Sequence, residues 1–154
     1  MAREHLFEAN LAWTGAAKGP ARDYEGYSRE YLVRIVGKPE ILGSAAVPFR
    51  GDGSLANPED LLLASVAACH LLSYLAECAR AGVVVVAYDD DCTAKMTFRD
   101  GKMRIVEATL RPRVCVSPES DVHKAKELHH AAHEGCFIAN SVAFPIHCEP
   151  TIYT

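Results

Sequence analysis

The sequence predicts an α+β fold, with antiparallel sheets and helices in separate parts of a single domain spanning residues 1–154. Segments of alternating apolar residues, typical of half-buried strands, lie before and after a long apolar helix. A strong hairpin signal separates that helix from a second one. The net charge is -4 and basic residues are not clustered, so nucleic acid is not expected as a partner.

Three strands are expected before the long helix. Alternating apolar residues predict the first over Phe7–Trp13 and the second over Tyr31–Ile35, and ILGSAAVPF holds the third. The loop FRGDGSLA then leads into the helix.

The long helix is expected from about Pro58 to Ala81. Asn57 can cap its start, and Gly82 is a natural stop after its last turn. Residues 61–75 are apolar on nearly every side, which indicates a helix that is buried on most sides. One small sheet covers one face, so a second subunit is expected to cover the rest.

After the long helix, Asp100-Gly101 predicts a hairpin between two strands. A second helix is expected from Ser117 to about Gly135, and alternating apolar residues predict a last strand over Val142–Cys148.

The first residues, MAREHLFEANLAW, contain no apolar core of signal-peptide length, so a cytoplasmic protein is expected. The longest mainly apolar run, Leu61–Ala68, is too short to cross a bilayer, and no membrane partner is expected. For an intracellular chain with six cysteines, reduced thiols, metal ligands or redox catalysis are favoured over structural disulfides.

The cysteines differ in what their positions indicate. Small buried apolar side chains are the expectation for four of them, namely Cys78, Cys92, Cys115 and Cys148. Cys69 lies in the middle of the long helix and Cys136 closes the second helix. Packing of these two helices could bring the two thiols within disulfide range, which the spacing alone leaves open.

A thiol in the middle of an apolar helix is expected to be inert unless a cation lies beside it. The candidate cations for Cys69 are Arg22, Arg29 and Arg50, all before the long helix. Glu59 could hold such a guanidinium through a bidentate pair and keep it aimed at the sulfur.

A metal site is the alternative reading of the second helix. His129, His133 and Cys136 follow at i, i+4 and i+7, which is acceptable spacing for zinc, and Cys69-His70 could complete the set. His70 points about 100° away from Cys69 on a helix, so a packing or interface histidine is also open.

Two motifs together resemble the OsmC/Ohr family of osmotically inducible and organic hydroperoxide resistance proteins. NPEDLLLASVAACH resembles the family's first-cysteine helix, and AHEGCFIANS resembles its second-cysteine motif. The order of the expected elements also matches, so the resemblance covers most of the chain. The chain differs from the family at Phe137, where proline is common, and at His70.

The resemblance implies an intertwined homodimer of OsmC-like type that acts as a cysteine-based peroxidase on organic hydroperoxides, and on hydrogen peroxide as a further substrate. Cys69 matches the peroxidatic cysteine, Cys136 the resolving one, and Glu59 the glutamate that orients an arginine. Arg50 matches the arginine of the OsmC branch and Arg22 lies nearer that of the Ohr branch, with Arg29 a third candidate.

The resemblance implies no cofactor and no metal, and it implies a dithiol or small-thiol reductant. A non-catalytic protein of the same fold that binds an apolar ligand, or one that senses redox state, is the alternative.

Overall fold

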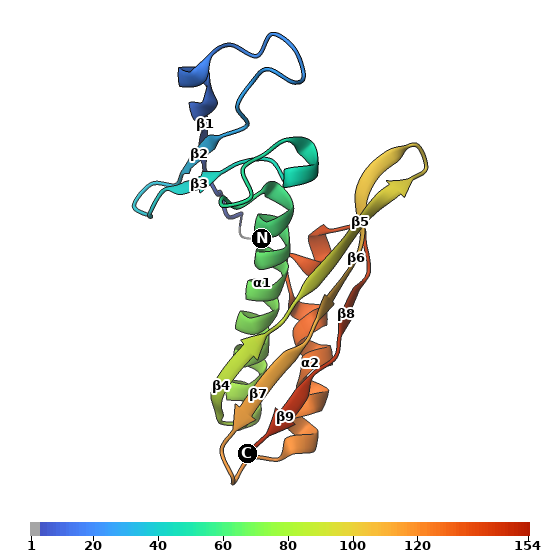
Figure 1. Cartoon of the computed structure of the whole chain (residues 1–154). Helices are drawn as coiled ribbons and strands as arrows, with labels where there is room; N and C mark the ends of the chain where they lie inside the picture. The colour runs from blue at the N-terminus through green and yellow to red at the C-terminus, as the bar shows by residue number, and fades with distance from the viewer. Residues whose placement is uncertain (1–3) are drawn as a thin grey trace. The chain divides into compact units, whose positions relative to one another are not determined.

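The structure is a computed structural model that describes residues 4–154 (Figure 1). Contacts divide the chain into two compact units, the first ending at Leu61 and the second covering Leu62–Thr154. The expectation of one domain over residues 1–154 stays a prediction.

The first unit is built on a small antiparallel sheet. Its strands β1 (Asn10–Trp13), β2 (Tyr31–Arg34) and β3 (Ile41–Gly43) pair in the order β1-β2-β3. The 3-10 helices η1 (Thr14–Lys18) and η2 (Val47–Phe49) follow β1 and β3.

One of the sequence predictions for this unit needs correction. Phe7 lies before β1 and is 90% exposed, because β1 pairs with β2 only from Asn10 onward. The strand predicted within ILGSAAVPF is confirmed as β3; it ends at Gly43, and VPF forms η2, since Pro48 brings no N–H to a strand ladder.

The long helix α1 (Pro58–Ala81) has the predicted bounds. Its start is a reciprocal cap in which the Asp60 N–H donates to Asn57 Oδ1 at 2.9 Å and the Asn57 N–H donates to Asp60 Oδ2 at 3.2 Å. Gly82 follows the last turn at φ 74°, a left-handed conformation that glycine adopts without steric cost.

Only one stripe of α1 is fully buried within a single chain. Val66, His70, Tyr74 and Cys78 form it at a spacing of four residues, while Leu72 is 67% exposed. By length and composition alone, α1 is long and apolar enough to cross a membrane. Helices at the core of soluble proteins can be equally apolar. In α1, exposed side chains such as Leu72 leave apolar surface that this chain does not cover.

In the second unit each of three long strands is broken in two. The pairs are β4 (Val85–Asp90) with β5 (Thr93–Arg99), β6 (Lys102–Leu110) with β7 (Pro112–Val116), and β8 (Ile146–Cys148) with β9 (Thr151–Tyr153). Within the described residues they form the sheets β4-β7-β9 and β5-β6-β8. The β6–β8 and β7–β9 pairings are parallel, so the α+β class is confirmed while these sheets are mixed rather than purely antiparallel.

Arg111 joins the break points of the three strands. Its backbone N–H donates to Asp90 Oδ1 at 2.7 Å, and its guanidinium donates to Glu149 Oε2 at 3.1 Å and to Thr93 Oγ1 at 3.1 Å. The backbone and side chain of this one residue therefore connect the points at which β4, β6 and β8 continue into β5, β7 and β9.

The hairpin between β5 and β6 is confirmed. Asp100 and Gly101 both have positive φ, 50° and 77°, as a two-residue type I′ turn requires. The sequence prediction of the last strand is wrong at its start, since β8 begins only at Ile146. Pro145 precedes it and lacks a donor, although its carbonyl accepts the Ala108 N–H at 3.0 Å.

The second helix, α2 (Val122–Gly135), starts later than predicted. Ser117 and Ser120 form a turn instead, with the Ser120 N–H donating to the Ser117 carbonyl at 2.9 Å. Asp121 is the true cap, because its carboxylate accepts the N–H groups of His123 at 2.8 Å and Lys124 at 3.1 Å.

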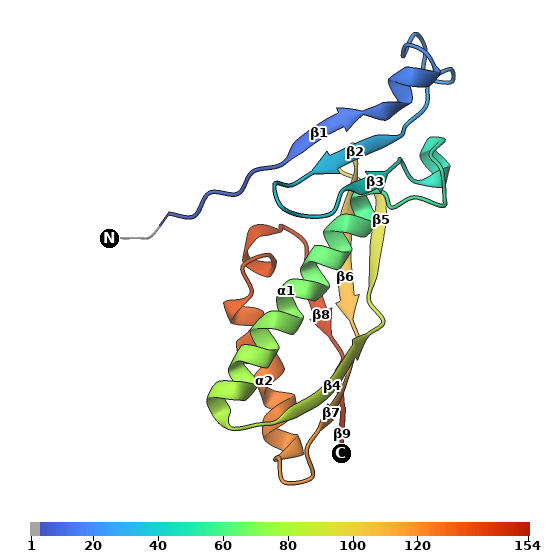
Figure 2. The ribbon, with the colours of Figure 1, turned by 90° about the vertical axis from the view of Figure 1, so that its left-hand side faces the viewer.

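The core of the second unit lies between the two helices and the sheet. Tyr74 and Cys78 of α1 meet Ala125 and Ala132 of α2, with Val114 of β7 beneath them. Figure 2 shows α1 and α2 side by side along the strands of this unit. The Tyr74 hydroxyl donates to the Ala125 carbonyl at 3.0 Å and ties the two helices together.

Replacing Asp121→Ala should lower the free energy of unfolding by about 1 kcal/mol, because two N–H groups of the first turn of α2 lose their acceptor. Thermal unfolding at fixed protein concentration measures this as a fall in Tm of about 2–4 °C. Glu119→Ala removes the same charge two residues earlier and is the control. Equal shifts in both variants would assign the effect to charge rather than to the cap.

Candidate functional site

Cys69 and Cys136 lie next to each other in the second unit. Cys69 is on the middle of α1 and is half-buried, whereas Cys136 directly follows α2 and is 1% exposed. Both are free thiols, and the Cys69 thiol adjoins Cys136 closely enough to affect its titration. The packing of α1 on α2 thus brings together the two cysteines that sequence spacing left unconnected.

The Cys136 thiol is held in its protonated form at neutral pH. Burial raises its pKa, and the adjoining Cys69 thiol adds to that rise. The Ala139 N–H, 3.4 Å from the Cys136 sulfur, opposes the rise only in part. Cys69 is the more accessible thiol of the pair and Cys136 the shielded one.

Among the other cysteines the prediction of small buried side chains is confirmed for Cys78, which is 1% exposed in the core. Cys92, between β4 and β5, and Cys115 of β7 are half-buried. The prediction is wrong for Cys148, because its sulfur contacts two histidines instead of apolar neighbours alone.

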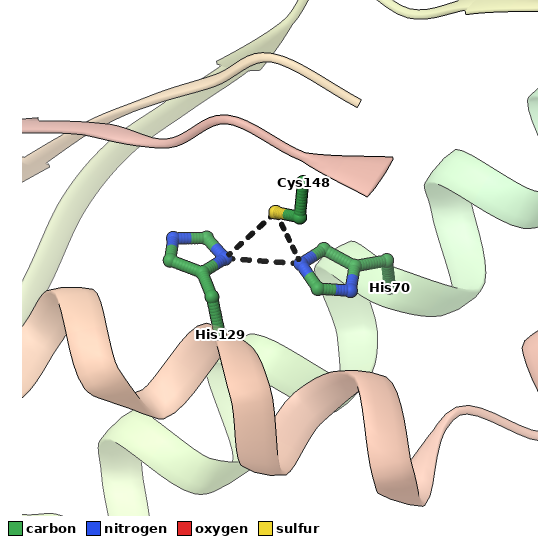
Figure 3. A group of neighbouring side chains, drawn as sticks. All are labelled: His70, His129 and Cys148. Carbon is green, nitrogen blue, oxygen red and sulfur yellow. Dashed lines mark hydrogen bonds between the residues drawn. The ribbon is translucent and has the colours of Figure 1, made fainter. Parts of the chain in front are cut away.

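Those histidines are His70 of α1 and His129 of α2. His70 Nε2 and His129 Nδ1 are 3.0 Å apart, and the Cys148 sulfur lies 3.6 Å and 3.8 Å from them (Figure 3). The side chains that could together bind a metal ion are therefore His70, His129 and Cys148. The predicted set of His129, His133 and Cys136 is not brought together in this way. The i, i+4 spacing from Val66 to His70 to Tyr74 was the available signal that His70 belongs to the buried stripe.

Burial lowers the pKa of both imidazoles, and His133 adds to the effect at His70. The ring of Tyr74 stacks on His129 with centroids 3.8 Å apart and covers one face of the pair. Both histidines are thus neutral at physiological pH and present nitrogen lone pairs to their neighbours.

Glu59 and the three candidate arginines all belong to the first unit. Glu59 is half-buried at the start of α1 and lines a cavity of about 280 Å³ with Tyr31, Arg29, Trp13 and Phe49. Burial raises the pKa of Tyr31, and the carboxylate of Glu59 adds to that rise.

The arginines have different surroundings. Arg29 donates to the carbonyls of Tyr24 and Tyr27 and lies over the Tyr27 ring at 3.9 Å, so it holds its own loop together. Arg50 is exposed, with a single ion pair of 3.4 Å to Glu25 among the described residues, and has a left-handed φ of 66°. Arg22 is exposed in the loop after η1.

A family model and several solved structures match this chain. The family model described as OsmC-like protein matches residues 51–151, which includes both cysteines of the pair. None of the curated proteins compared with this chain matches it.

Solved structures with the same fold cover nearly the whole chain. An OsmC-like protein of unknown function from Vibrio cholerae is 29% identical, with a TM-score of 0.86 over 96% of this chain and 100% of that one. An organic hydroperoxide resistance protein from Elizabethkingia anophelis is 19% identical, with a TM-score of 0.72 over 100% and 99% of the two chains. The organic hydroperoxide resistance protein OhrB of Bacillus subtilis is also 19% identical, with a TM-score of 0.64 over 97% and 100%.

Brief treatment of the reduced native protein with iodoacetamide should alkylate Cys69 ahead of Cys136 and Cys148. Cys69 is the accessible member of its pair, while burial raises the pKa of both other thiols, that of Cys148 to about 12. Mass spectrometry of tryptic peptides gives the order, and reduced protein in denaturant, where all six thiols react alike, is the control. Faster alkylation of Cys148 than of Cys69 would contradict this assignment.

Proposed function

This chain belongs to the OsmC-like protein family, and we propose that it is a thiol-dependent peroxidase that reduces organic hydroperoxides through Cys69 and Cys136. The observation that carries the proposal is the proximity of two free thiols of unlike accessibility, one on α1 and one at the end of α2. The names of the Elizabethkingia and Bacillus structures, both organic hydroperoxide resistance proteins, support the same chemistry.

In the first step the Cys69 thiolate attacks the outer oxygen of the hydroperoxide. The O–O bond breaks, the alkoxide takes up a proton and leaves as the alcohol, and Cys69 becomes a sulfenic acid. The apolar residues of α1 around Cys69 favour an organic hydroperoxide over hydrogen peroxide as substrate.

In the second step Cys136 resolves the sulfenic acid. Its sulfur bonds to the Cys69 sulfur, and the sulfenic hydroxyl leaves as water with the Cys136 proton. A thiol that remains protonated until this moment does not compete for the peroxide, which agrees with the raised pKa of Cys136. A dithiol or small-thiol reductant of the cytoplasm then exchanges with the disulfide and restores both thiols.

Arg50 is proposed as the cation that favours the Cys69 thiolate, with Glu59 orienting it. A guanidinium with one long exposed ion pair is free to serve a thiol, whereas that of Arg29 is occupied by backbone carbonyls. The positive φ of Arg50 supports a functional role, since strained backbone conformations concentrate at such sites.

The active form is proposed to be a homodimer. Exposed apolar residues of α1 such as Leu72 and Leu75 need a cover, and a second copy of α1 supplies one of matching character. In an intertwined dimer the arginine and the thiol pair can come from different subunits.

A second candidate function is the binding of a small apolar ligand in the first unit. The cavity of about 280 Å³ is lined mostly by apolar side chains, among them Leu11, Trp13 and Phe49. This volume is close to the lower end of ligand pockets. A protein that retains such a ligand and does not oxidise Cys69 under peroxide would have this function instead.

Disulfide formation without steady turnover of peroxide would indicate a redox sensor.

Cys69→Ser should abolish the consumption of cumene hydroperoxide, because a serine hydroxyl does not replace the thiolate as nucleophile. Cys136→Ser should complete one turnover and then accumulate sulfenic or sulfinic acid on Cys69, since the resolving thiol is missing. Peroxide assays with a dithiol reductant, followed by peptide mass spectrometry, give both results. Cys115→Ser is the matched control and should keep the wild-type rate. Full activity in Cys69→Ser would overturn the proposal.

Arg50→Lys should lower kcat/KM by about 100-fold, because a lysine does not reproduce the planar guanidinium donors beside the thiolate. Arg29→Lys should instead lower the Tm with less effect on the rate, since it releases the loop carbonyls. Arg34→Lys, on a surface arginine paired with Glu40 at 2.9 Å, is the control and should change neither. The reverse pattern, with the rate lost only in Arg29→Lys, would transfer the role to Arg29.

A further inference from the structure

Three ligating atoms from three separate elements converge in the core of the second unit. They are Nε2 of His70 on α1, Nδ1 of His129 on α2 and the sulfur of Cys148 on β8 (Figure 3). The ligand atoms all lie within 4.8 Å of one another, and the histidines are 1% and 4% exposed. The thiol pair Cys69 and Cys136 takes no part in this trio.

The separations fit one metal ion at the centre of the trio. Metal–nitrogen bonds of about 2.0–2.1 Å and a metal–sulfur bond of about 2.3 Å, at tetrahedral angles, put nitrogen and sulfur about 3.6 Å apart. The observed nitrogen–sulfur separations are 3.6 Å and 3.8 Å. The same geometry puts the two nitrogens about 3.3 Å apart, so the 3.0 Å separation needs a ring shift of a few tenths of an ångström.

Packing alone gives a poor account of these side chains. The outer nitrogens, His70 Nδ1 and His129 Nε2, are buried without a hydrogen-bond partner in the described part of the chain. Leaving such groups unsatisfied is unfavourable, by roughly 1–3 kcal/mol each, so two apolar residues would fill this space at lower cost. A metal ion bound to the inner nitrogens, His70 Nε2 and His129 Nδ1, would offset this cost and explain why two histidines occupy the space.

The chemistry of the three side chains also fits a metal ion. Two neutral imidazoles and one thiolate are ligands that zinc prefers, and three protein ligands leave a fourth position for water or a small molecule.

We propose that His70, His129 and Cys148 form a binding site for a divalent transition metal of the zinc class. On binding, the Cys148 thiol loses its proton to solvent and the sulfur bonds to the metal. The proton shared by the two inner nitrogens moves to the outer nitrogen of the same ring, so both imidazoles stay neutral and one proton is released per ion. The ion then joins α1, α2 and β8, and the first two of these elements also position the thiol pair.

The test begins with cobalt(II) as a spectroscopic probe in the reduced, chelator-treated full-length protein. We expect a sulfur-to-cobalt charge-transfer band that saturates at one equivalent, disappears on addition of zinc, and is absent in Cys148→Ser. Cys115→Ser and His130→Gln, which change a half-buried thiol and an 82% exposed histidine outside the trio, should keep the band. His129→Gln should weaken cobalt binding by more than roughly 100-fold. Loss of a residue that only hydrogen-bonds to a metal ligand costs up to about that much, and loss of the ligand itself should cost more.

A second measurement needs no variant and so does not depend on how a variant folds. Zinc should slow the alkylation of Cys148 in the wild-type protein by at least about tenfold and leave the rate at Cys115 unchanged. Absence of both the cobalt band and the protection would overturn the proposal. A band that survives in Cys148→Ser and is lost in Cys69→Ser would also overturn it, because the metal would then sit on the thiol pair.

Discussion

The packing of α1 against α2 is the interaction on which the rest of the second unit depends. It is made along one stripe of α1, in which every fourth residue from Val66 to Cys78 is buried. Tyr74 connects this stripe to α2, because its hydroxyl donates to the Ala125 carbonyl at 3.0 Å and its ring stacks on His129. A small rotation of either helix would break both contacts.

The two groups of reactive side chains follow from this one contact. Cys69 directly precedes His70, a residue of the buried stripe, and so lies beside the stripe at the edge of the helix pair. There it is half-buried and adjoins Cys136. His70 lies on the stripe itself and is therefore carried into the interior against His129. Neighbouring residues in sequence thus enter different environments because successive side chains on a helix point about 100° apart.

Local signals in the sequence were sufficient for much of the fold. The cap at Asn57 and the stop at Gly82 defined α1 to the residue, and Asp100-Gly101 defined the hairpin. The predicted start of α2 is wrong because Ser117-Pro118-Glu119 carries the same kind of capping signal as Asp121. Only the hydrogen bonds of the folded chain distinguish the two positions. The parallel pairing of β8 with β6 involves strands more than thirty residues apart, about which alternation carries no information.

The sequence by itself determined the α+β class, the bounds of α1, the hairpin, and the placement of Cys69 within one helix and of Cys136 at the end of another. The tertiary structure alone decided that Cys69 meets Cys136 and that Cys148 joins His70 and His129 rather than serving as an apolar side chain. The physical reason is that caps and turns depend on bonds within a few residues, whereas these contacts depend on how α1, α2 and β8 pack around Tyr74. That packing is set by the burial of many distant side chains at once, and no single motif encodes it.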